Sequence, residues 1–210
     1  MRRVVKSSWF FWMLFLCIGF GSVGFCAELA PSAEIIAAAR QGLVDFPGLT
    51  GASLQEGFQV YTATPAALMS NDDLGAIMIP TGQWRFVVTC GEQPMGLLTV
   101  AQVEGQWQAV SLGGAGLATE MSRVLKTWDP GNGYNFRFVR VYQAMTDLVE
   151  ISRANDSRKQ GYVPLTSARA SLGIRGEFAP GVLLNDAEII LPLRDAVAKN
   201  INMFEAQPQK

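Results

Sequence analysis

Residues 83–114, QWRFVVTCGEQPMGLLTVAQVEGQWQAVSLGG, set the architecture of this chain because three strand-like runs follow one another there. The runs are QWRFVVTCG, PMGLLTVAQVEG and QWQAVSLGG, and all are short and rich in Val, Trp, Phe and Thr. Two turn signals separate them, GEQP at 91–94 and Glu104-Gly105. Short strands joined by tight turns predict an antiparallel meander.

The first of these runs has apolar residues on both sides of the strand. Strict alternation places Trp84, Phe86, Val88 and Cys90 on one face, and Arg85, Val87 and Thr89 on the other. A free cysteine on an apolar face behaves as a small hydrophobic residue. We therefore predict that Cys90 is a buried core thiol and not a nucleophile.

Helical and strand-like segments flank the meander. Ser32 is a helix cap before Ala33–Asp45, and Pro65 follows the cap residue Thr64 at the start of a short helical turn. The other expected helices are 114–128, a short one capped by Thr166 or Ser167, and a terminal one that begins at Pro192. The other expected strands are 57–64, 74–80, an antiparallel pair at 134–144 and 145–155, and 187–191, with a turn at 154–161.

This order of elements predicts an α+β fold with a curved antiparallel sheet, the meander, packed by helices. About 184 residues after position 26 are enough for one domain with a genuine core, so 27–210 is expected to be a single domain. The expected architecture is similar to cystatin-like, NTF2-like and PAS-like folds. No individual motif carries that similarity.

The first 26 residues have the composition of an export signal. Three basic residues within the first six precede an uncharged stretch from Ser7 to Ala27, whose most apolar part is Trp9 to Phe20. Small residues then allow cleavage after Gly24 or Cys26, as in a secretory signal peptide. A retained membrane anchor is the alternative, since roughly 20 apolar residues span a bilayer. A lipid on Cys26 fits poorly, because Phe25 before it is not small. The sequence predicts an extracytoplasmic protein, secreted, periplasmic or held by its N-terminal segment.

Charge is unevenly distributed after the leader. The chain has 17 Lys plus Arg and 18 Asp plus Glu, and three of the bases lie before residue 27, so the remainder has a formal charge of −4. This acidity disfavours a nucleic-acid partner. Residues 123–175 are nevertheless rich in bases. They face the acidic half of the domain, are simply solvated, or form a patch for an anionic membrane or envelope polymer. The residues of that candidate patch are Arg137, Arg140, Arg153, Arg158 and Lys159.

Two further features of the sequence bear on ligand binding. Arg140 falls on the same strand face as Phe136 and Phe138 unless a bulge near Val139 turns it away, and such conflicts between pattern and charge sometimes mark functional sites. Glycines at 113, 114 and 116 lie between a strand and a helix without the spacing of a phosphate-binding loop. A tight turn explains them, although exposed amides there can still bind an anion weakly.

Aromatic residues such as Trp84 and Trp107 either line a pocket for an apolar or sugar-like ligand or pack a curved sheet against a helix.

The chain contains no histidine, which excludes catalysis by serine or cysteine with an imidazole base and the common zinc sites. Three cysteines, of which one lies well inside the leader and one at its cut, exclude a disulfide framework. We expect no cofactor. The leading hypothesis is a non-enzymatic envelope or secreted protein that binds a small ligand, a partner protein or an anionic surface. The alternatives are a hydrolase that uses carboxylates and a self-assembling structural component, with a homo-oligomer as one outcome.

Overall fold

The computed structural model describes residues 30–153 and 156–205, with the backbone alone at 156–160. The leader predicted at 1–26 lies outside these residues, as do Cys17 and Cys26. Within the described ranges, none of the helices combines the length and the apolar character needed to cross a bilayer.

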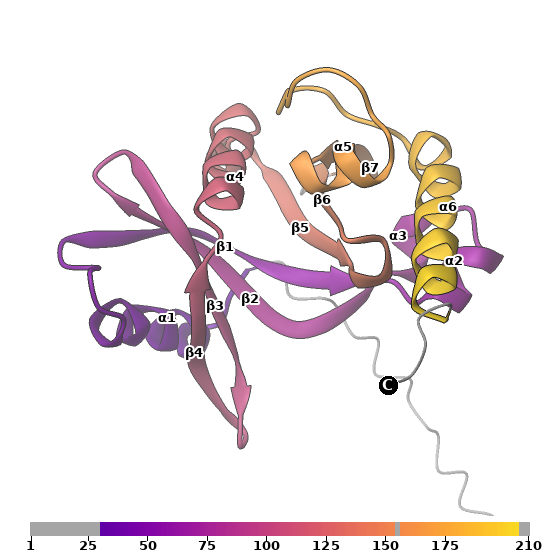
Figure 1. Ribbon diagram of the computed structural model, residues 1–210. Helices are drawn as coiled ribbons and strands as arrows, with labels where there is room; N and C mark the ends of the chain where they lie inside the picture. The colour runs from indigo at the N-terminus through magenta and orange to yellow at the C-terminus, as the bar shows by residue number, and fades with distance from the viewer. Residues whose placement is uncertain (1–29, 154–155, 206–210) are drawn as a thin grey trace, which may run out of the picture.

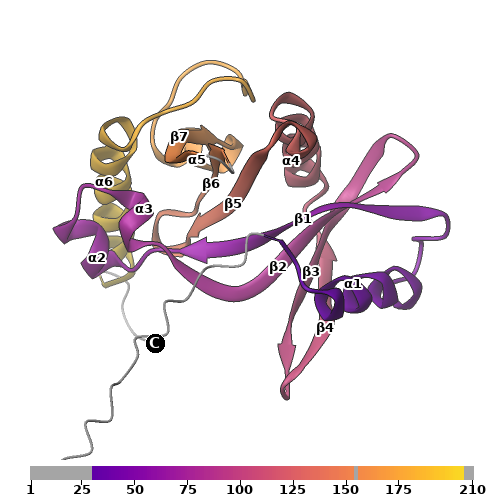
Figure 2. The same cartoon turned by 180° about the vertical axis from the view of Figure 1, so that it is seen from behind.

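A seven-stranded mixed sheet forms the centre of the molecule (Figures 1 and 2). Its strands, in spatial order, are β4 (Gln106–Gly113), β3 (Gln93–Val103), β2 (Ile79–Cys90), β1 (Ala52–Thr62), β5 (Tyr134–Val141), β6 (Thr146–Arg153) and β7 (Asp156–Pro164). The predicted meander is confirmed as β2, β3 and β4, and the predicted antiparallel pair as β5 and β6. Strands β1 and β5 are parallel and pair only at Val60–Phe138 and Tyr61–Val139. This short junction joins a four-stranded part of the sheet to a three-stranded part.

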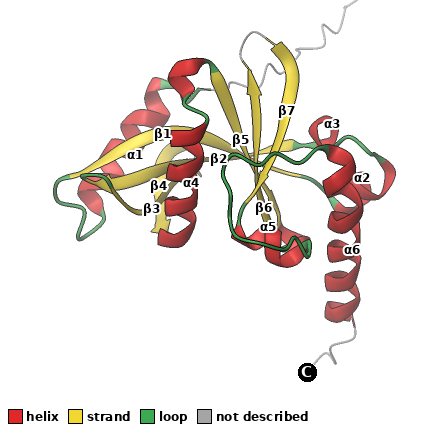
Figure 3. Cartoon of the chain, turned by 90° about the horizontal axis from the view of Figure 1, so that it is seen from above, coloured by secondary structure: helices red, strands yellow, loops and turns green. Residues whose placement is uncertain are grey.

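Helices pack against this predominantly antiparallel sheet, so the fold is α+β as predicted. They are α1 (Ala33–Asp45), α2 (Pro65–Ser70), α3 (Leu74–Ile77), α4 (Ala115–Thr127), α5 (Thr166–Ser171) and α6 (Asp186–Glu205), with 3-10 turns η1 (Pro130–Asn132) and η2 (Tyr142–Ala144). Figure 3 shows β3 and β4 between α1 and α4, while α2, α3 and α6 lie together at the other end of the molecule.

The alternation predicted for β2 is confirmed, because its residues contribute alternately to two apolar clusters on opposite faces of the sheet. Trp84, Phe86 and Val88 belong to the apolar cluster beneath α1. Val87 belongs to a second cluster, which also contains Phe136 and Phe138 of β5 and which α4 covers. A third cluster lies between β5, β6 and α6. Because β2 is buried on both faces, any polar residue in its centre has an apolar surrounding.

The prediction that Cys90 is buried is wrong, because its side chain is exposed. It is the last residue of β2 and precedes Gly91 in the hairpin turn, where the backbone φ is 58°. Alternation fixes the face on which a side chain lies, but burial also needs a layer above that face. The cluster beneath α1 includes Val88 but does not extend to Cys90.

Four other local predictions are wrong for related reasons. Residues 74–77 form α3 and not a strand, because the Asp73 side chain accepts a hydrogen bond from the amide of Ala76. Residues 156–161, which were predicted to lie in a turn, belong to β7, and this strand pairs with β6. Residues 187–191 belong to α6, which begins six residues before Pro192 and contains this proline. Helix α5 begins after Leu165, so Thr166 and Ser167 lie within its first turn and are not its cap.

Candidate ligand-binding site

Arg85 places a positive charge in the middle of the buried strand β2. It pairs across the strands with Thr99 of β3 and shares its face with Val87, the face that α4 covers. Its side chain is partly buried, and its Nε is shielded from solvent without a hydrogen-bond partner. No ion pair joins Arg85 to a carboxylate within the described part of the chain. Contacts within the protein therefore offset only part of the free-energy cost of desolvating the Arg85 guanidinium.

The contacts that Arg85 does make are weak or unfavourable. Its guanidinium lies over the ring of Phe138, 4.9 Å from the centroid, in a cation–π contact. Burial lowers the pKa of Arg85 below its usual value, and the neighbouring charge of Arg140 lowers that pKa further. Asp147 opposes this shift. Two cations thus share one neighbouring carboxylate.

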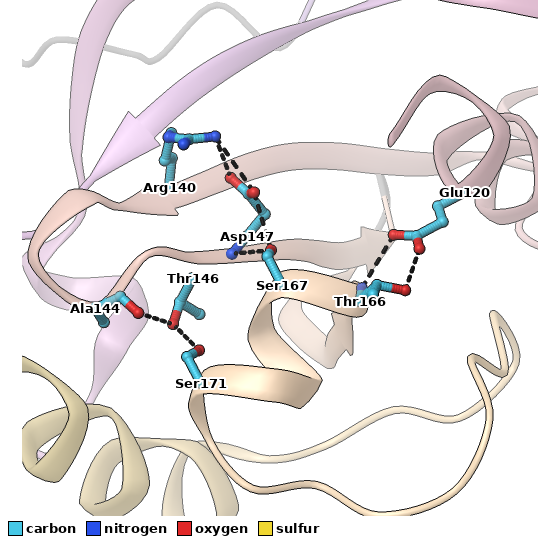
Figure 4. Close-up of polar contacts among 8 residues, drawn as sticks. All are labelled: Glu120, Arg140, Ala144, Thr146, Asp147, Thr166, Ser167 and Ser171. Atoms are coloured by element: carbon cyan, nitrogen blue, oxygen red, sulfur yellow. Dashed lines mark hydrogen bonds and ion pairs between the residues drawn. The ribbon is translucent and has the colours of Figure 1, made fainter. Parts of the chain in front are cut away.

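Arg140 lies on the phenylalanine face of β5, as alternation predicts in the absence of a bulge. The pairing of β5 with β6 is regular from Tyr134 to Val141, so no extra residue turns Arg140 away. The conflict between charge and apolar surroundings is resolved by Asp147, which pairs with Arg140 across the strands at 3.0 Å and accepts a hydrogen bond from the hydroxyl of Ser167 at 2.9 Å (Figure 4). Asp147 is buried and already committed to these two donors.

Helix α4 directs its N-terminus toward the same region. Its cap is Gly114, which has a left-handed backbone conformation with φ of 68° and supplies no side-chain hydrogen bond. No acidic residue occurs in the first turn of α4. The amides of this turn carry the positive end of the helix dipole.

The N-termini of the other α-helices in the described ranges differ from this one. Each has a side-chain oxygen as hydrogen-bond partner, from Ser32 for α1, Thr64 for α2, Asp73 for α3, Glu120 for α5 and Asn185 for α6. Figure 4 shows the bonds from Thr166 of α5 to Glu120. Among these helices, α4 alone has an N-terminus without a hydrogen bond from its amides to a side-chain oxygen within the described residues.

A pocket of about 270 Å³ joins these features. Arg85 and Arg140 line it together with Gly113 and Gly114, which lead into α4. The remainder of the lining is Leu97, Thr99, Ser111, Leu112 and Leu117. The pocket spans the junction of the sheet, because Arg85 belongs to the four-stranded part and Arg140 to the three-stranded part. It combines two guanidinium groups, a helix N-terminus and hydroxyl groups, which is the donor set for an anion.

Larger hollows lie along β1, but each is lined by at least as many acidic as basic residues. One, of about 480 Å³, is lined by Arg40 of α1 and by Glu56 of β1. Another, of about 610 Å³, is lined by Glu56, Lys126 and Asp129. Neither contains a basic group that lacks an acidic neighbour, so the smaller pocket is the better candidate for an anion.

The basic residues predicted as one patch do not lie on one face. Arg137 alternates with Arg140 and is on the opposite face of β5, where it forms an ion pair with the buried carboxylate of Glu150 and lies over the ring of Tyr61. Arg153 is exposed and donates a hydrogen bond to the hydroxyl of Tyr134. Arg158 and Lys159 belong to β7, and their side chains lie outside the described part of the structure.

The two tryptophans singled out from the sequence are packing residues. Trp84 is buried in the cluster beneath α1, and Trp107 packs against the same cluster. Neither belongs to the pocket of Arg85 and Arg140. Sequence reasoning placed Arg85 on the correct face but did not select it as a site residue, although a charge inside an apolar strand was the available signal.

No protein-family model, curated protein or solved structure matches this chain. The similarity to cystatin-like, NTF2-like or PAS-like folds therefore stays a prediction. Function has to be inferred from the geometry of the pocket itself.

Proposed function

We propose that this chain is an exported, non-enzymatic binding protein whose ligand is a small anion held between Arg85 and Arg140. The observation that carries the proposal is the state of Arg85. It is a partly buried arginine with a solvent-shielded Nε that has no partner, in a pocket that it shares with a second arginine.

The charges of the pocket favour an anion as occupant. Arg85 and Arg140 contribute two positive charges, and Asp147 contributes one negative charge that Arg140 and Ser167 already engage. Buried charges in proteins are normally paired, since the desolvation of an unpaired charge is costly. A negative ligand supplies the missing partner, and the amides at the start of α4 add to its stabilisation.

The extracytoplasmic location rests on the first 26 residues alone. A basic end, an uncharged apolar stretch and small residues follow one another in the order of an export signal. Whether that segment is removed or holds the protein at a membrane does not affect the pocket, which the residues after position 84 form.

Binding is tested on the full protein, expressed with its leader and purified as its host processes it. Isothermal titration calorimetry at constant ionic strength compares sodium acetate, phosphate and sulfate with sodium chloride. We expect saturable binding of at least one polyatomic anion, and an Arg85→Met variant that binds it about 10- to 100-fold more weakly, because a hydrogen bond to a charged group contributes roughly 1.5–3 kcal/mol.

The matched control is Arg153→Gln, which removes the same charge from an exposed position outside the pocket. It should bind like the parent protein. Equal weakening by both substitutions indicates a nonspecific charge effect, and absence of saturable binding to all three anions refutes the proposal. Arg140 is not the residue to change, because its loss leaves the buried Asp147 without its cation.

A further inference from the structure

We infer that the anion is the carboxylate of a short aliphatic acid, whose hydrocarbon chain lies against the leucines of the same pocket. This inference rests on the proposed function and names the ligand class for it. Three features support it: the apolar part of the lining, the net charge of the site and the size of the pocket.

The apolar part of the lining consists of three leucines from three different elements. Leu97 comes from β3, Leu112 from β4 and Leu117 from the first turn of α4. Leu97 is buried, while Leu112 and Leu117 pack against the two core clusters and keep part of their surface open. A site for a bare inorganic ion needs polar groups on all sides. This pocket has its donors beside a leucine surface, which fits a ligand with a charged head and an apolar body.

The net charge of the site favours a single negative charge on the ligand. Two arginines and one aspartate give one unit of positive charge in excess. A carboxylate neutralises this excess, whereas a dianion such as phosphate would leave the site with one net negative charge. A guanidinium also offers parallel N–H groups that match the two oxygens of a carboxylate. Thr99 and Ser111 also line the pocket, and each carries a hydroxyl group that can donate a hydrogen bond.

The size of the pocket limits the length of the chain. Its volume of about 270 Å³ lies just below the range of roughly 300–1,000 Å³ that is usual for sites of drug-sized ligands. A ligand of a few carbon atoms fills such a space. Longer chains must leave the pocket and gain nothing further from burial.

The experiment measures dissociation constants for acetate, butyrate, hexanoate and octanoate, with phosphate and sulfate for comparison, on the protein as its host processes it. Affinity should rise about three- to fourfold for each methylene group added, because burial of one CH₂ contributes about 0.8 kcal/mol. It should then level off within the series. In a Leu117→Ala variant the gain per methylene should fall, and Arg85→Met should weaken all four acids.

The outcomes separate this inference from the proposed function. Binding of phosphate or sulfate through Arg85, with no dependence of carboxylate affinity on chain length, overturns the inference and leaves the proposed function standing. Gains per methylene that persist in Leu117→Ala overturn the placement of the chain and with it the inference. Absence of binding to every anion overturns both. Circular dichroism and thermal unfolding of Leu117→Ala confirm that the variant is folded.

Discussion

Replacing Arg85 by methionine should make the protein more stable when no polyatomic anion is present. Methionine keeps an unbranched apolar stem of similar length, and it removes the charge and the N–H groups. In the parent protein the guanidinium is partly buried, lacks an ion pair among the described residues and lies near the like charge of Arg140. A residue with such costs in the unliganded protein is expected to serve binding, since sites of function are often destabilising.

The size of the effect follows from two opposing contributions. A buried donor without a partner costs roughly 1–3 kcal/mol, which the substitution recovers. The cation–π contact of Arg85 with Phe138, at 4.9 Å from the ring centroid, is lost, and such contacts contribute about 0.5–2 kcal/mol. The balance is a gain of about 1 kcal/mol in the free energy of unfolding, or roughly 2–4 °C in Tm for a domain of this size.

Differential scanning calorimetry in a chloride buffer measures this shift, and a second series with added ligand anion completes the test. The anion should raise the Tm of the parent protein by mass action and raise that of Arg85→Met by less at the same concentration. An exposed control, Arg153→Gln, should leave the Tm within about 1 °C, since surface substitutions usually change stability by less than about 0.5 kcal/mol. A Tm of Arg85→Met well below that of the parent protein would refute the reasoning, because Arg85 would then be a structural residue.

Other predictions concern the opposite face of the sheet, the thiol and the leader. Burial raises the pKa of both Tyr61 and Tyr162, with Arg137 acting in the opposite direction in each case. As the pH rises, the unfolded state loses its phenolic protons before the folded state does. The free energy of unfolding should therefore be constant below about pH 10 and fall above it. Urea unfolding between pH 8 and 11 measures this change, and a flat profile would contradict the prediction. Exposed Cys90 should react with a thiol reagent in the folded protein, and Cys90→Ser should change the free energy of unfolding by less than about 0.5 kcal/mol; a protected thiol would show that it is buried. If the leader is cleaved, N-terminal sequencing should find a start within residues 25–28, whereas an intact mass that includes Met1 would support the anchor.

The parts of the fold that the sequence predicts are those with local causes. Helix α1 begins after Ser32 and ends at Asp45 as expected, because the capping side chain and the apolar spacing are both read within a few residues. The meander was predictable for the same reason, since its turns and its alternation are local. Predictions failed where a second element decides the outcome. The exposure of Cys90 depends on how far the cluster beneath α1 extends, and the start of α6 before Pro192 depends on Asn185 and Glu188, which bond reciprocally.

The candidate site was predictable only as separate fragments. The sequence indicated a conflict at Arg140 and a glycine turn with open amides near Gly114, and it placed Arg85 on one face of its strand. Their meeting depends on the order of the strands, in which β1 separates β2 from β5. That order requires the parallel pairing of β1 with β5, for which the chain contains no local signal. Arg137 and Arg140 show the opposite case, because they are three residues apart in sequence but lie on opposite faces of β5.

The two arginines of β5 differ in how their charges are neutralised by carboxylates on β6. On one face, Arg137 is matched by Glu150 through two hydrogen bonds, so cation and carboxylate are equal in number. On the other face, Asp147 serves Arg140, and Arg85 is added without a carboxylate of its own. Strands β5 and β6 thus supply one carboxylate for one arginine on the first face, but one carboxylate for two arginines on the second face. Since α4 is also the α-helix whose first turn has no side-chain cap within the described residues, the excess positive charge and the open amides coincide. Two independent costs at one pocket are explained together by a single anionic ligand, whereas a purely structural role explains neither.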